Sequence, residues 1–228
     1  MEFVFVCQFH LFLNQATPKL KSPLQYLSIF YRIHAFASPY VILNLFLEGE
    51  KMNFVAMDFE TANHYPESAC SLALVMVRKN KIVDRFYTVI NPQMPFDARN
   101  IQVHDITAND VKDAPTMAEV WPKIKGLYKP GMLVTAHNAR FDTNVMRQSL
   151  ARYDIQEPHY LVVDTLQSSK LFEPKLPNHK LDTVSKALNV ELWHHHNALS
   201  DSEACAGILI AQNKKFGDDA IKNLIYQI

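Results

Sequence analysis

The alternation of short apolar runs with longer amphipathic segments constrains the fold of this chain more than any other feature. Runs of about four to eight apolar residues are typical of buried strands, whereas apolar positions three and four apart indicate helices. The strand-like runs are residues 53–57, 71–77, 82–90, 132–136 and 161–163. The segments with helical character are residues 116–128, 139–153, 180–188, 201–214 and 218–226. In chain order, these elements predict a mixed sheet with helices packed on its faces.

Local signals mark the ends of some of these elements. Residues 79–81 (KNK) are expected to form a hairpin turn between the second and third strands. Asn138 is placed to cap the helix predicted over 139–153. Residues 95–111 are expected to form a loop with a short helical piece.

Composition bounds the class of protein. The chain has 228 residues, of which 48% are apolar and five are glycine, which indicates a globular domain with a sizeable core. Its formal net charge is zero, so it lacks the basic footprint that drives non-specific nucleic-acid binding. That argues against a passive DNA-coating protein but not against a nuclease, whose bound cations supply positive charge. Three separated cysteines fit no metal-ligand spacing and indicate a reducing compartment such as the cytoplasm, with Cys70 and Cys205 as small buried side chains.

Residues 1–51 differ from the rest, being aromatic and aliphatic with little periodicity. A signal peptide is not favoured, because no basic residue precedes Lys19 and no small-residue cleavage site follows the first apolar run. Residues 25–47 are long enough to span a membrane, but Arg32, His34 and Pro39 interrupt them, so a membrane anchor is not expected.

The residues just before Met52 suggest where translation starts. LEGEKM back-translates to codons that contain a purine-rich AAGGAG element shortly upstream of an ATG, as in a bacterial ribosome-binding site. We therefore hypothesise that translation starts at Met52, so that 1–51 is an N-terminal extension and 52–228 is the functional domain. An intact-mass measurement of the native protein checks this hypothesis.

Four carboxylates and one histidine lie at the edges of the predicted elements. Asp58 and Glu60 follow the first strand at positions i and i+2, so both point to the same side of an extended chain. Asp142 follows the strand 132–136 through a short turn, at the sheet edge where ligand sites of open α/β sheets usually lie. His196 precedes Asp201, which begins the helix 201–214.

Each of these signals also has a structural explanation. Asp58 and Glu60 are compatible with a solvated strand end, Asp142 with a helix-dipole contact and Asp201 with an N-cap. The five together are better explained by a site, because carboxylates repel one another and a fold collects them mainly to hold divalent cations. A histidine beside them titrates near neutral pH and can take a proton from water. The set predicts metal-assisted hydrolysis of a phosphodiester.

A zinc site in the histidine run is not favoured. Three consecutive histidines cannot all point at one ion from a regular backbone, and no cysteine lies nearby in the sequence. His194 and His195 are therefore interpreted as loop residues.

Three segments resemble the motifs of the DEDD exonuclease superfamily, in its histidine-bearing branch: FVAMDFETAN, TAHNARFD and HHNALSDSEA. That branch includes the proofreading epsilon subunit of bacterial DNA polymerase III, oligoribonuclease and RNase T. The resemblance covers the chain from Met52 onward. It implies an α/β, ribonuclease H-like fold with a five-stranded mixed sheet flanked by helices. It also implies two bound Mg²⁺ or Mn²⁺ ions and release of nucleoside monophosphates from the 3′ ends of single-stranded DNA or RNA.

The resemblance also implies a role for each motif residue. Asp58 would bridge both metal ions, Glu60 and Asp201 would hold the ion that binds the attacking water, and Asp142 would help to hold the other ion. His196 would be the general base.

Four further positions resemble the family's substrate contacts. Phe59, Thr61 and Phe141 would flank the terminal nucleotide, and His104 would lie beside the 3′ end. Relatives commonly carry His-Gly-Ile at this last position, whereas here Asp105 replaces the glycine. The alternative for all four is core packing or loop structure.

The leading hypothesis is thus a 3′→5′ exonuclease. A DNA-processing epsilon-like enzyme and an RNA-trimming enzyme remain alternatives within this class, and a non-catalytic nucleic-acid-binding domain is the alternative outside it. Only 27 residues follow Asp201, which weakens the expectation of a polymerase-binding tail. A polymerase partner is left open. A homodimer is compatible with the resemblance, because dimers are common among the relatives.

Overall fold

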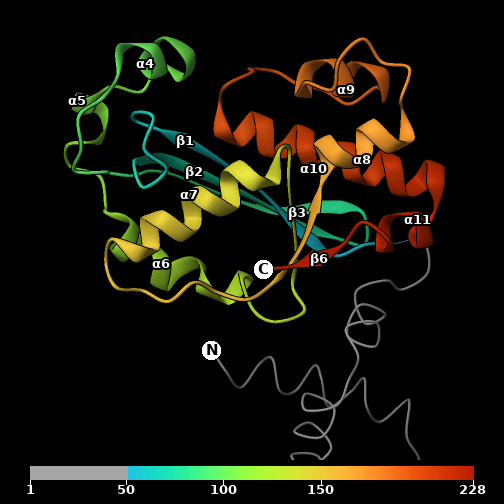
Figure 1. Cartoon of the computed structure of the whole chain (residues 1–228), viewed down its shortest axis with the longest axis horizontal. Helices are drawn as coiled ribbons and strands as arrows, with labels where there is room; N and C mark the ends of the chain where they lie inside the picture. Colours follow the sequence, from blue (N-terminus) through green and yellow to red (C-terminus); the bar gives the residue numbers. More distant parts are fainter. Residues whose placement is uncertain (1–50) are drawn as a thin grey trace, which may run out of the picture. The chain divides into compact units, whose positions relative to one another are not determined.

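The computed structural model describes residues 51–228 (Figure 1). The hypotheses about a membrane anchor and an N-terminal extension therefore concern residues outside the described part of the chain. The strands are β1 (Phe54–Thr61), β2 (Ala69–Arg78), β3 (Lys81–Val89), β4 (Leu133–Ala136), β5 (Leu161–Asp164) and β6 (Tyr226–Gln227). The α-helices are α4 (Ala98–His104), α5 (Ala108–Val111), α6 (Met117–Ile124), α7 (Ala139–Ala151), α8 (Thr165–Phe172), α9 (Leu181–Ala187), α10 (Ala198–Phe216) and α11 (Asp218–Lys222).

The strands form one mixed sheet in the order β3-β2-β1-β4-β5-β6. The pairs β1–β4 and β4–β5 are parallel, and the other three pairs are antiparallel. The predicted mixed α/β fold is confirmed. The expected number of five strands is wrong for residues 51–228, because a short sixth strand, β6, pairs with β5 at the edge of the sheet.

The extra strand replaces the end of a predicted helix. Residues 218–226 were expected to be helical, but α11 ends at Lys222. Leu224 and Ile225 then pack against the core from the turn between α11 and β6. The backbone N–H of Ile228 donates to the carbonyl of Tyr160 at 3.0 Å, which continues the pairing of the chain end with the sheet. Apolar residues that looked like a helical face thus belong to an edge strand and the turn before it.

Helices cover both faces of the sheet, and the alternation of side chains along β1 separates two cores. Val55, Met57 and Phe59 pack with residues of α6 and α7, whereas Phe54 and Ala56 pack with residues of α10 and α11. Figure 1 shows α6 and α7 together, apart from α8 to α11. Full burial of each large side chain stabilises the fold by roughly 1.5–3 kcal/mol.

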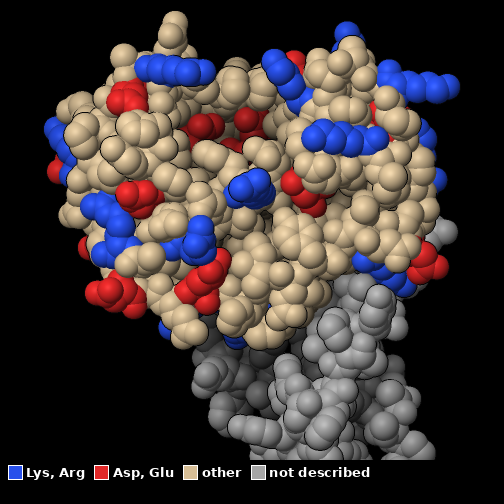
Figure 2. All heavy atoms as spheres, in the orientation of Figure 1, with Lys and Arg blue, Asp and Glu red and all other residues tan. Residues whose placement is uncertain are grey.

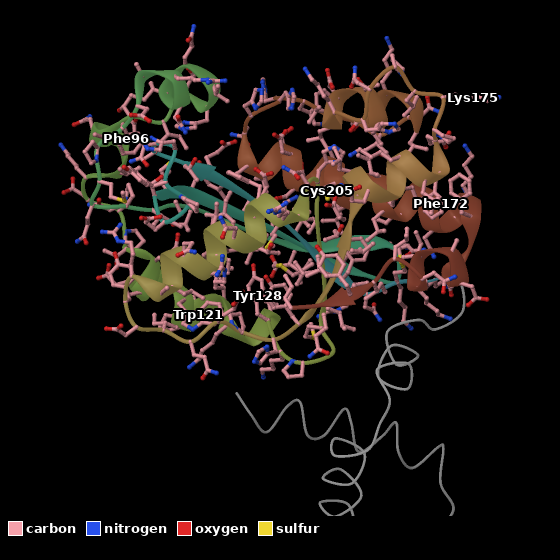
Figure 3. The ribbon with its side chains drawn as sticks, viewed as in Figure 1. Phe96, Trp121, Tyr128, Phe172, Lys175 and Cys205 are labelled. Carbon is pink, nitrogen blue, oxygen red and sulfur yellow. The ribbon has the colours of Figure 1, made fainter. Side chains whose placement is uncertain are left out.

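Aromatic rings extend the first of these cores. The rings of Tyr128 and Trp121 (Figure 3) lie 5.8 Å apart between centroids. The ring of Tyr128 also lies 5.2 Å from that of Tyr160, and its hydroxyl lies 3.6 Å from the sulfur of Met57. On the other side, Phe172 of α8 stacks on Phe216 of α10 at 4.5 Å. The last of these contacts joins α8 to α10, the helix that carries Asp201.

The predicted hairpin turn and the buried thiols are confirmed. Lys79 and Asn80 both have positive φ, 51° and 60°, as a two-residue type I′ turn requires. Asn80 also exchanges hydrogen bonds with the backbone of Met52, whose side chain is fully buried. Cys70 and Cys205 are buried free cysteines.

Asp164, and not Asn138, caps the helix after β4. Asn138 adopts the left-handed conformation, with φ of 74°, and its side chain makes no capping bond, so that expectation is wrong. Instead, the carboxylate of Asp164 accepts the N–H groups of Asn138 and Ala139, each at 3.1 Å. The same carboxylate accepts the N–H groups of Leu166 and Gln167 and so caps α8. One side chain therefore anchors the N-terminal ends of both helices.

Helix α8 was not predicted, because its sequence TLQSSKLF has no helical apolar stripe. Its cap comes from the last residue of β5. Among the helices of residues 51–228, none combines the length and the apolarity that crossing a bilayer would require.

Candidate active site

Three carboxylates from two elements meet on one face of the sheet. Asp58 and Glu60 lie within β1, which continues to Thr61, and alternate with residues that face α6 and α7. Both therefore face α10, whose first turn carries Asp201. Ligand oxygens of Asp58, Glu60 and Asp201 lie within 4.8 Å of one another. The i, i+2 spacing thus brings the first two together, and the packing of α10 on β1 adds the third.

Asp142 reaches the same place from the other side of the sheet. It lies in the first turn of α7, as expected, and is 1% exposed. One of its carboxylate oxygens accepts the backbone N–H of Phe59 at 3.0 Å, between Asp58 and Glu60 in sequence. The negative charge of Asp142 raises the pKa of Asp58, after the larger effect of burial. Asp142 is therefore a fourth member of the cluster.

Burial and mutual repulsion perturb the titration of the cluster. Burial, followed by the charge of Asp201, raises the pKa of Glu60 from 4.5 to about 8. Burial raises the pKa of Asp201 to about 7, against the effect of a hydrogen bond from the backbone of His196. Because the charged forms of these groups are disfavoured in the absence of a compensating charge, a cation among them would relieve both effects.

The donor set fits a divalent metal ion. The Oδ1 atom of Asp201 is buried and accepts no hydrogen bond from any described residue. Buried acceptors are rarely left without a partner, so a bound ligand is expected to contact this oxygen. Carboxylate oxygens gathered at this separation are the ligands that hard divalent cations prefer.

His196 lies in the loop between α9 and α10, next to the carboxylates. Its φ of 67° is left-handed, and its backbone N–H donates to Oδ2 of Asp201 at 3.0 Å. Its ring stacks on that of His195, with centroids 4.0 Å apart, and is exposed to solvent. Asn197 caps α10 by accepting the N–H of Ser200, so this cap is Asn197 and not Asp201. The loop therefore places an exposed imidazole beside Asp201.

Two of the carboxylates, Asp58 and Asp201, line a hollow of about 350 Å³ together with His196. Figure 2 shows acidic side chains recessed in a hollow on the face in view, with basic side chains near it. The lining includes Asp58, His196 and Asp201 and also five residues that the sequence analysis did not select: His137, Leu166, Lys180, Leu181 and His195.

Two of these additional residues have specific surroundings. His195 was interpreted as a loop residue, and it does lie in a loop, but its ring also comes within 4.8 Å of His196 and Asp201. His137 donates from Nε2 to the carbonyl of His179 at 2.9 Å, and its Nδ1 lies 3.0 Å from the hydroxyl of Thr165. Burial lowers the pKa of His137, which fits a neutral ring that makes these two contacts. His137 was visible in the segment TAHNARFD, whereas nothing local in the sequence marked Lys180.

The two phenylalanines predicted to flank a nucleotide differ in exposure. Phe59 is 2% exposed and packs in the core with Met57 and residues of α7, so its ring has no free face for a base. Its contribution to the site is the backbone N–H that Asp142 accepts. Phe141, directly before Asp142, is 43% exposed. Only Phe141 of this pair is placed to contact a ligand.

His104 joins the end of β1 to the loop after α4. Its Nδ1 accepts the N–H of Ile106 at 3.0 Å, so its Nε2 carries the proton and donates to the carbonyl of Thr61 at 3.1 Å. Both ring nitrogens are thus bonded to backbone, and the ring is 8% exposed. Asp105 takes up the left-handed conformation, φ 61°, which glycine favours and aspartate tolerates. The replacement of glycine by Asp105 is therefore compatible with this turn.

A mixed sheet with four carboxylates near the C-terminal end of its central strand, β1, is typical of ribonuclease H-like nucleases that use metal ions. Comparison with known proteins identifies the family. The chain belongs to the RNase T exonuclease family, whose sequence pattern matches residues 55–209.

The chain is also similar to a segment of much longer proteins, the PolC-type DNA polymerases III. It is 36% identical over 180 residues to the PolC-type DNA polymerase III of Caldanaerobacter subterraneus subsp. tengcongensis, and 30% identical over 176 residues to that of Bacillus subtilis. These matches cover 78% and 76% of this chain but only 12% of each polymerase. The chain thus spans about an eighth of the length of these relatives.

Solved structures of exonucleases share the fold. Exonuclease X in complex with 5′-overhanging duplex DNA has a TM-score of 0.61 and 23% identity, over 75% of this chain and 98% of that one. Escherichia coli exonuclease I in complex with a dA16 oligonucleotide has a TM-score of 0.60 and 17% identity, over 72% of this chain and 41% of that one. At these identities the likeness establishes the ribonuclease H-like fold.

Proposed function

We propose that this chain is a metal-dependent 3′→5′ exonuclease that releases nucleoside monophosphates from the 3′ end of single-stranded DNA. The observation that carries the proposal is the partly buried group of Asp58, Glu60 and Asp201, beside the imidazole of His196. One oxygen of Asp201 has no hydrogen-bond partner among residues 51–228. Membership of an exonuclease family supports the reaction class. The PolC-type relatives favour DNA over RNA as substrate.

The carboxylates would hold two Mg²⁺ or Mn²⁺ ions. Asp58 is central to the cluster, since the charges of the other three carboxylates all act on it, which suits a residue that bridges both ions. Glu60 and Asp201 would complete one site, and Asp142 would help to hold the second ion. When bound, such ions activate the attacking water and stabilise the leaving 3′ oxygen.

The remaining roles belong to side chains around the cluster. His196 would take the proton of the attacking water from the solvent-exposed side, where its ring can also release that proton. The hydrogen bond from its backbone to Asp201 ties the loop to the carboxylates and keeps the ring in place. Thr61 and the exposed ring of Phe141 would flank the terminal nucleotide. His104 would act beside the 3′ end by holding the backbone of Thr61.

A gel assay with 5′-labelled single-stranded DNA and RNA tests the proposal. Purified protein should shorten the DNA from its 3′ end in the presence of Mg²⁺ or Mn²⁺ and leave it intact in EDTA. Asp58→Ala and His196→Ala proteins should lose the ladder. A ladder that forms only on RNA would assign the RNA-trimming alternative. The absence of cleavage on both polymers, with folded protein, would favour the binding-domain alternative.

A further inference from the structure

A second hollow, of about 540 Å³, adjoins the proposed active site. Its walls are the loop between β1 and β2 (residues 62–68) and the first residues of α4, and its lining includes Thr61 and Phe141. Because these two residues are also the proposed contacts of the terminal nucleotide, the hollow lies next to the proposed position of that nucleotide. Its volume lies within the range of about 300–1,000 Å³ that is usual for ligand pockets.

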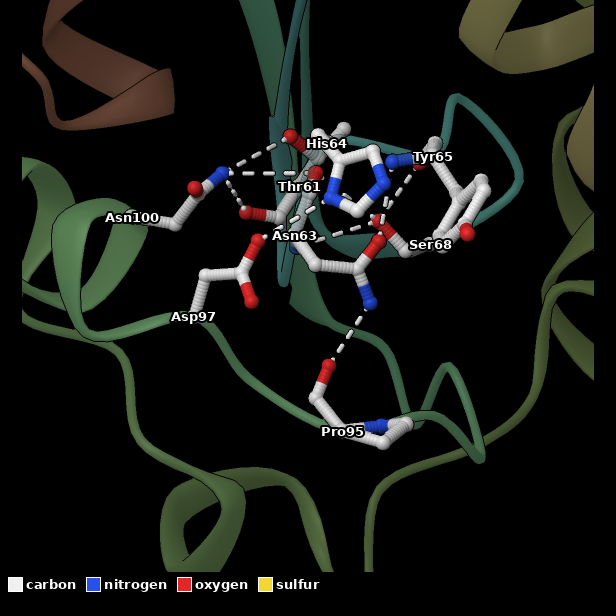
Figure 4. Close-up of polar contacts among 8 residues, drawn as sticks. All are labelled: Thr61, Asn63, His64, Tyr65, Ser68, Pro95, Asp97 and Asn100. Atoms are coloured by element: carbon white, nitrogen blue, oxygen red, sulfur yellow. Dashed lines mark hydrogen bonds and ion pairs between the residues drawn. The ribbon is translucent and has the colours of Figure 1, made fainter.

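The loop that forms one wall is held by buried side chains. Asn63 is 3% exposed; its side-chain amide donates to the carbonyl of Pro95 at 2.7 Å, and its side-chain oxygen accepts the N–H of Tyr65 at 2.9 Å. The hydroxyl of Ser68, fully buried, donates to the carbonyl of Tyr65 at 2.7 Å. These bonds cross the loop from one side to the other (Figure 4). The backbone at Tyr65 is thus fixed from within.

Helix α4 is tied to the same loop. The side-chain amide of Asn100 donates to the carbonyl of Thr61 at 2.8 Å and also lies 3.4 Å from that of Asn63. The N–H of Asp97 donates to the carbonyl of Ala62 at 2.8 Å. The two walls of the hollow are therefore one bonded unit, in place before any ligand binds.

This rigid base presents aromatic rings to solvent. Tyr65 is 50% exposed, and its ring lies 4.0 Å from that of His64, which is itself near the carboxylate of Asp97. With Phe141, also exposed, the rings border a hollow whose lining includes the cation of Arg99. Exposed rings beside an arginine are the means by which proteins hold single-stranded nucleic acid without reading its sequence.

We propose that this hollow binds the second nucleotide from the 3′ end of the substrate, with its base stacked on Tyr65 and its phosphate facing Arg99. The inference rests on the proposed function, since it extends the strand from the terminal nucleotide at Thr61 and Phe141. It assigns to the loop 62–68 the task of gripping the strand upstream of the bond that is cut. Affinity for an oligonucleotide then depends on a base that is not being removed.

The test compares two substrates in steady-state kinetics. One is a single-stranded oligonucleotide. The other is the p-nitrophenyl ester of thymidine 5′-monophosphate, which carries a terminal nucleotide but no second one. Tyr65→Ala should raise KM for the oligonucleotide about tenfold, as expected for loss of one stacked base, and leave ester hydrolysis within twofold of the wild type. Tyr65→Phe, which keeps the ring, should restore the wild-type KM.

An abasic site at the second position gives an independent measurement. It should raise KM for the wild-type protein by about as much as Tyr65→Ala does, and should have no further effect in that variant. Tyr226→Ala, which removes a similarly exposed tyrosine from β6, is the matched control and should behave as the wild type on both substrates.

Two results would overturn the assignment. An equal loss on both substrates would mean that Tyr65 supports the catalytic site structurally. An unchanged KM for the oligonucleotide would mean that the second base lies elsewhere. Ester hydrolysis by the wild-type protein separates these results from a failure of the proposed function, in which neither substrate is cleaved.

Discussion

Replacing Glu60 by glutamine should stabilise the metal-free protein at neutral pH while abolishing its activity. Burial and the charge of Asp201 raise the pKa of Glu60 from 4.5 to about 8 in the folded protein. Because the folded protein favours the protonated form of Glu60, the contribution of this side chain to the free energy of unfolding is greatest below pH 4.5. That contribution is lost as the pH rises from 4.5 toward 8. Glutamine has a similar shape and no proton to lose, so it removes this dependence.

The magnitude follows from the difference between the two pKa values. Between pH 4.5 and 8, each pH unit lowers the free energy of unfolding by about 1.4 kcal/mol. At pH 7 this amounts to at most roughly 3.4 kcal/mol, and partial contact of Glu60 with solvent reduces it, so we expect about 1–3 kcal/mol. For a domain of this size, 1 kcal/mol corresponds to about 2–4 °C, so the variant should melt roughly 5 °C above the wild type at pH 7.

Thermal unfolding in EDTA at pH 5, 7 and 8 measures this effect, and the difference between the two proteins should grow with pH. Addition of Mg²⁺ should then raise the melting temperature of the wild type more than that of Glu60→Gln, because a ligand stabilises only the state that binds it. Glu191→Gln, at an exposed position, is the matched control and should behave as the wild type. Equal melting temperatures in EDTA at pH 7 would refute the burial argument. Equal gains from Mg²⁺ would refute the role of Glu60 as a ligand.

Three further predictions concern neighbouring residues. His196→Ala should lower kcat by about 10²–10⁴-fold but preserve the Mg²⁺-induced rise in melting temperature; loss of both would make His196 a ligand instead of a base. Phe59→Ala should destabilise the fold by about 3–5 kcal/mol in urea unfolding, because its ring is buried, whereas Phe141→Ala should raise KM with little change in stability. The reverse pattern would contradict the assigned exposures. Asp164→Ala should lower the free energy of unfolding in urea by about 2–4 kcal/mol, since four backbone N–H groups lose their acceptor. Asp164→Asn should lower it less, because the amide oxygen can still accept some of these hydrogen bonds.

Much of the sheet and of the carboxylate cluster could be predicted because both depend on local sequence. Five apolar runs became β1 to β5, and the positions of Asp58 and Glu60 two residues apart in a strand placed them on one face. Asp142 and Asp201 follow from the same logic, since each lies in the first turn of a helix.

The errors arose where a distant residue decides the local structure. Asn138 looked like a cap, but the cap of α7 comes from Asp164, 26 residues further on. The chain end looked helical, but its pairing with β5 made it a strand. Phe59 was expected to flank the nucleotide because it follows Asp58 in the motif, yet the alternation of side chains along β1 points its ring into the core. No window of sequence contains these partners, so periodicity could not reveal them.

The hydrogen bonds of Asp164 join the N-termini of α7 and α8 through one carboxylate. The amide protons of Asn138, Ala139, Leu166 and Gln167 therefore depend on a single acceptor, and one movement of that side chain would release all four. Hydrogen exchange at these amides should then occur as one cooperative event, although the amides belong to two helices. Asp142 of the carboxylate cluster and Leu166 of the hollow would open together in such an event, so the site can be lost locally while the sheet remains folded.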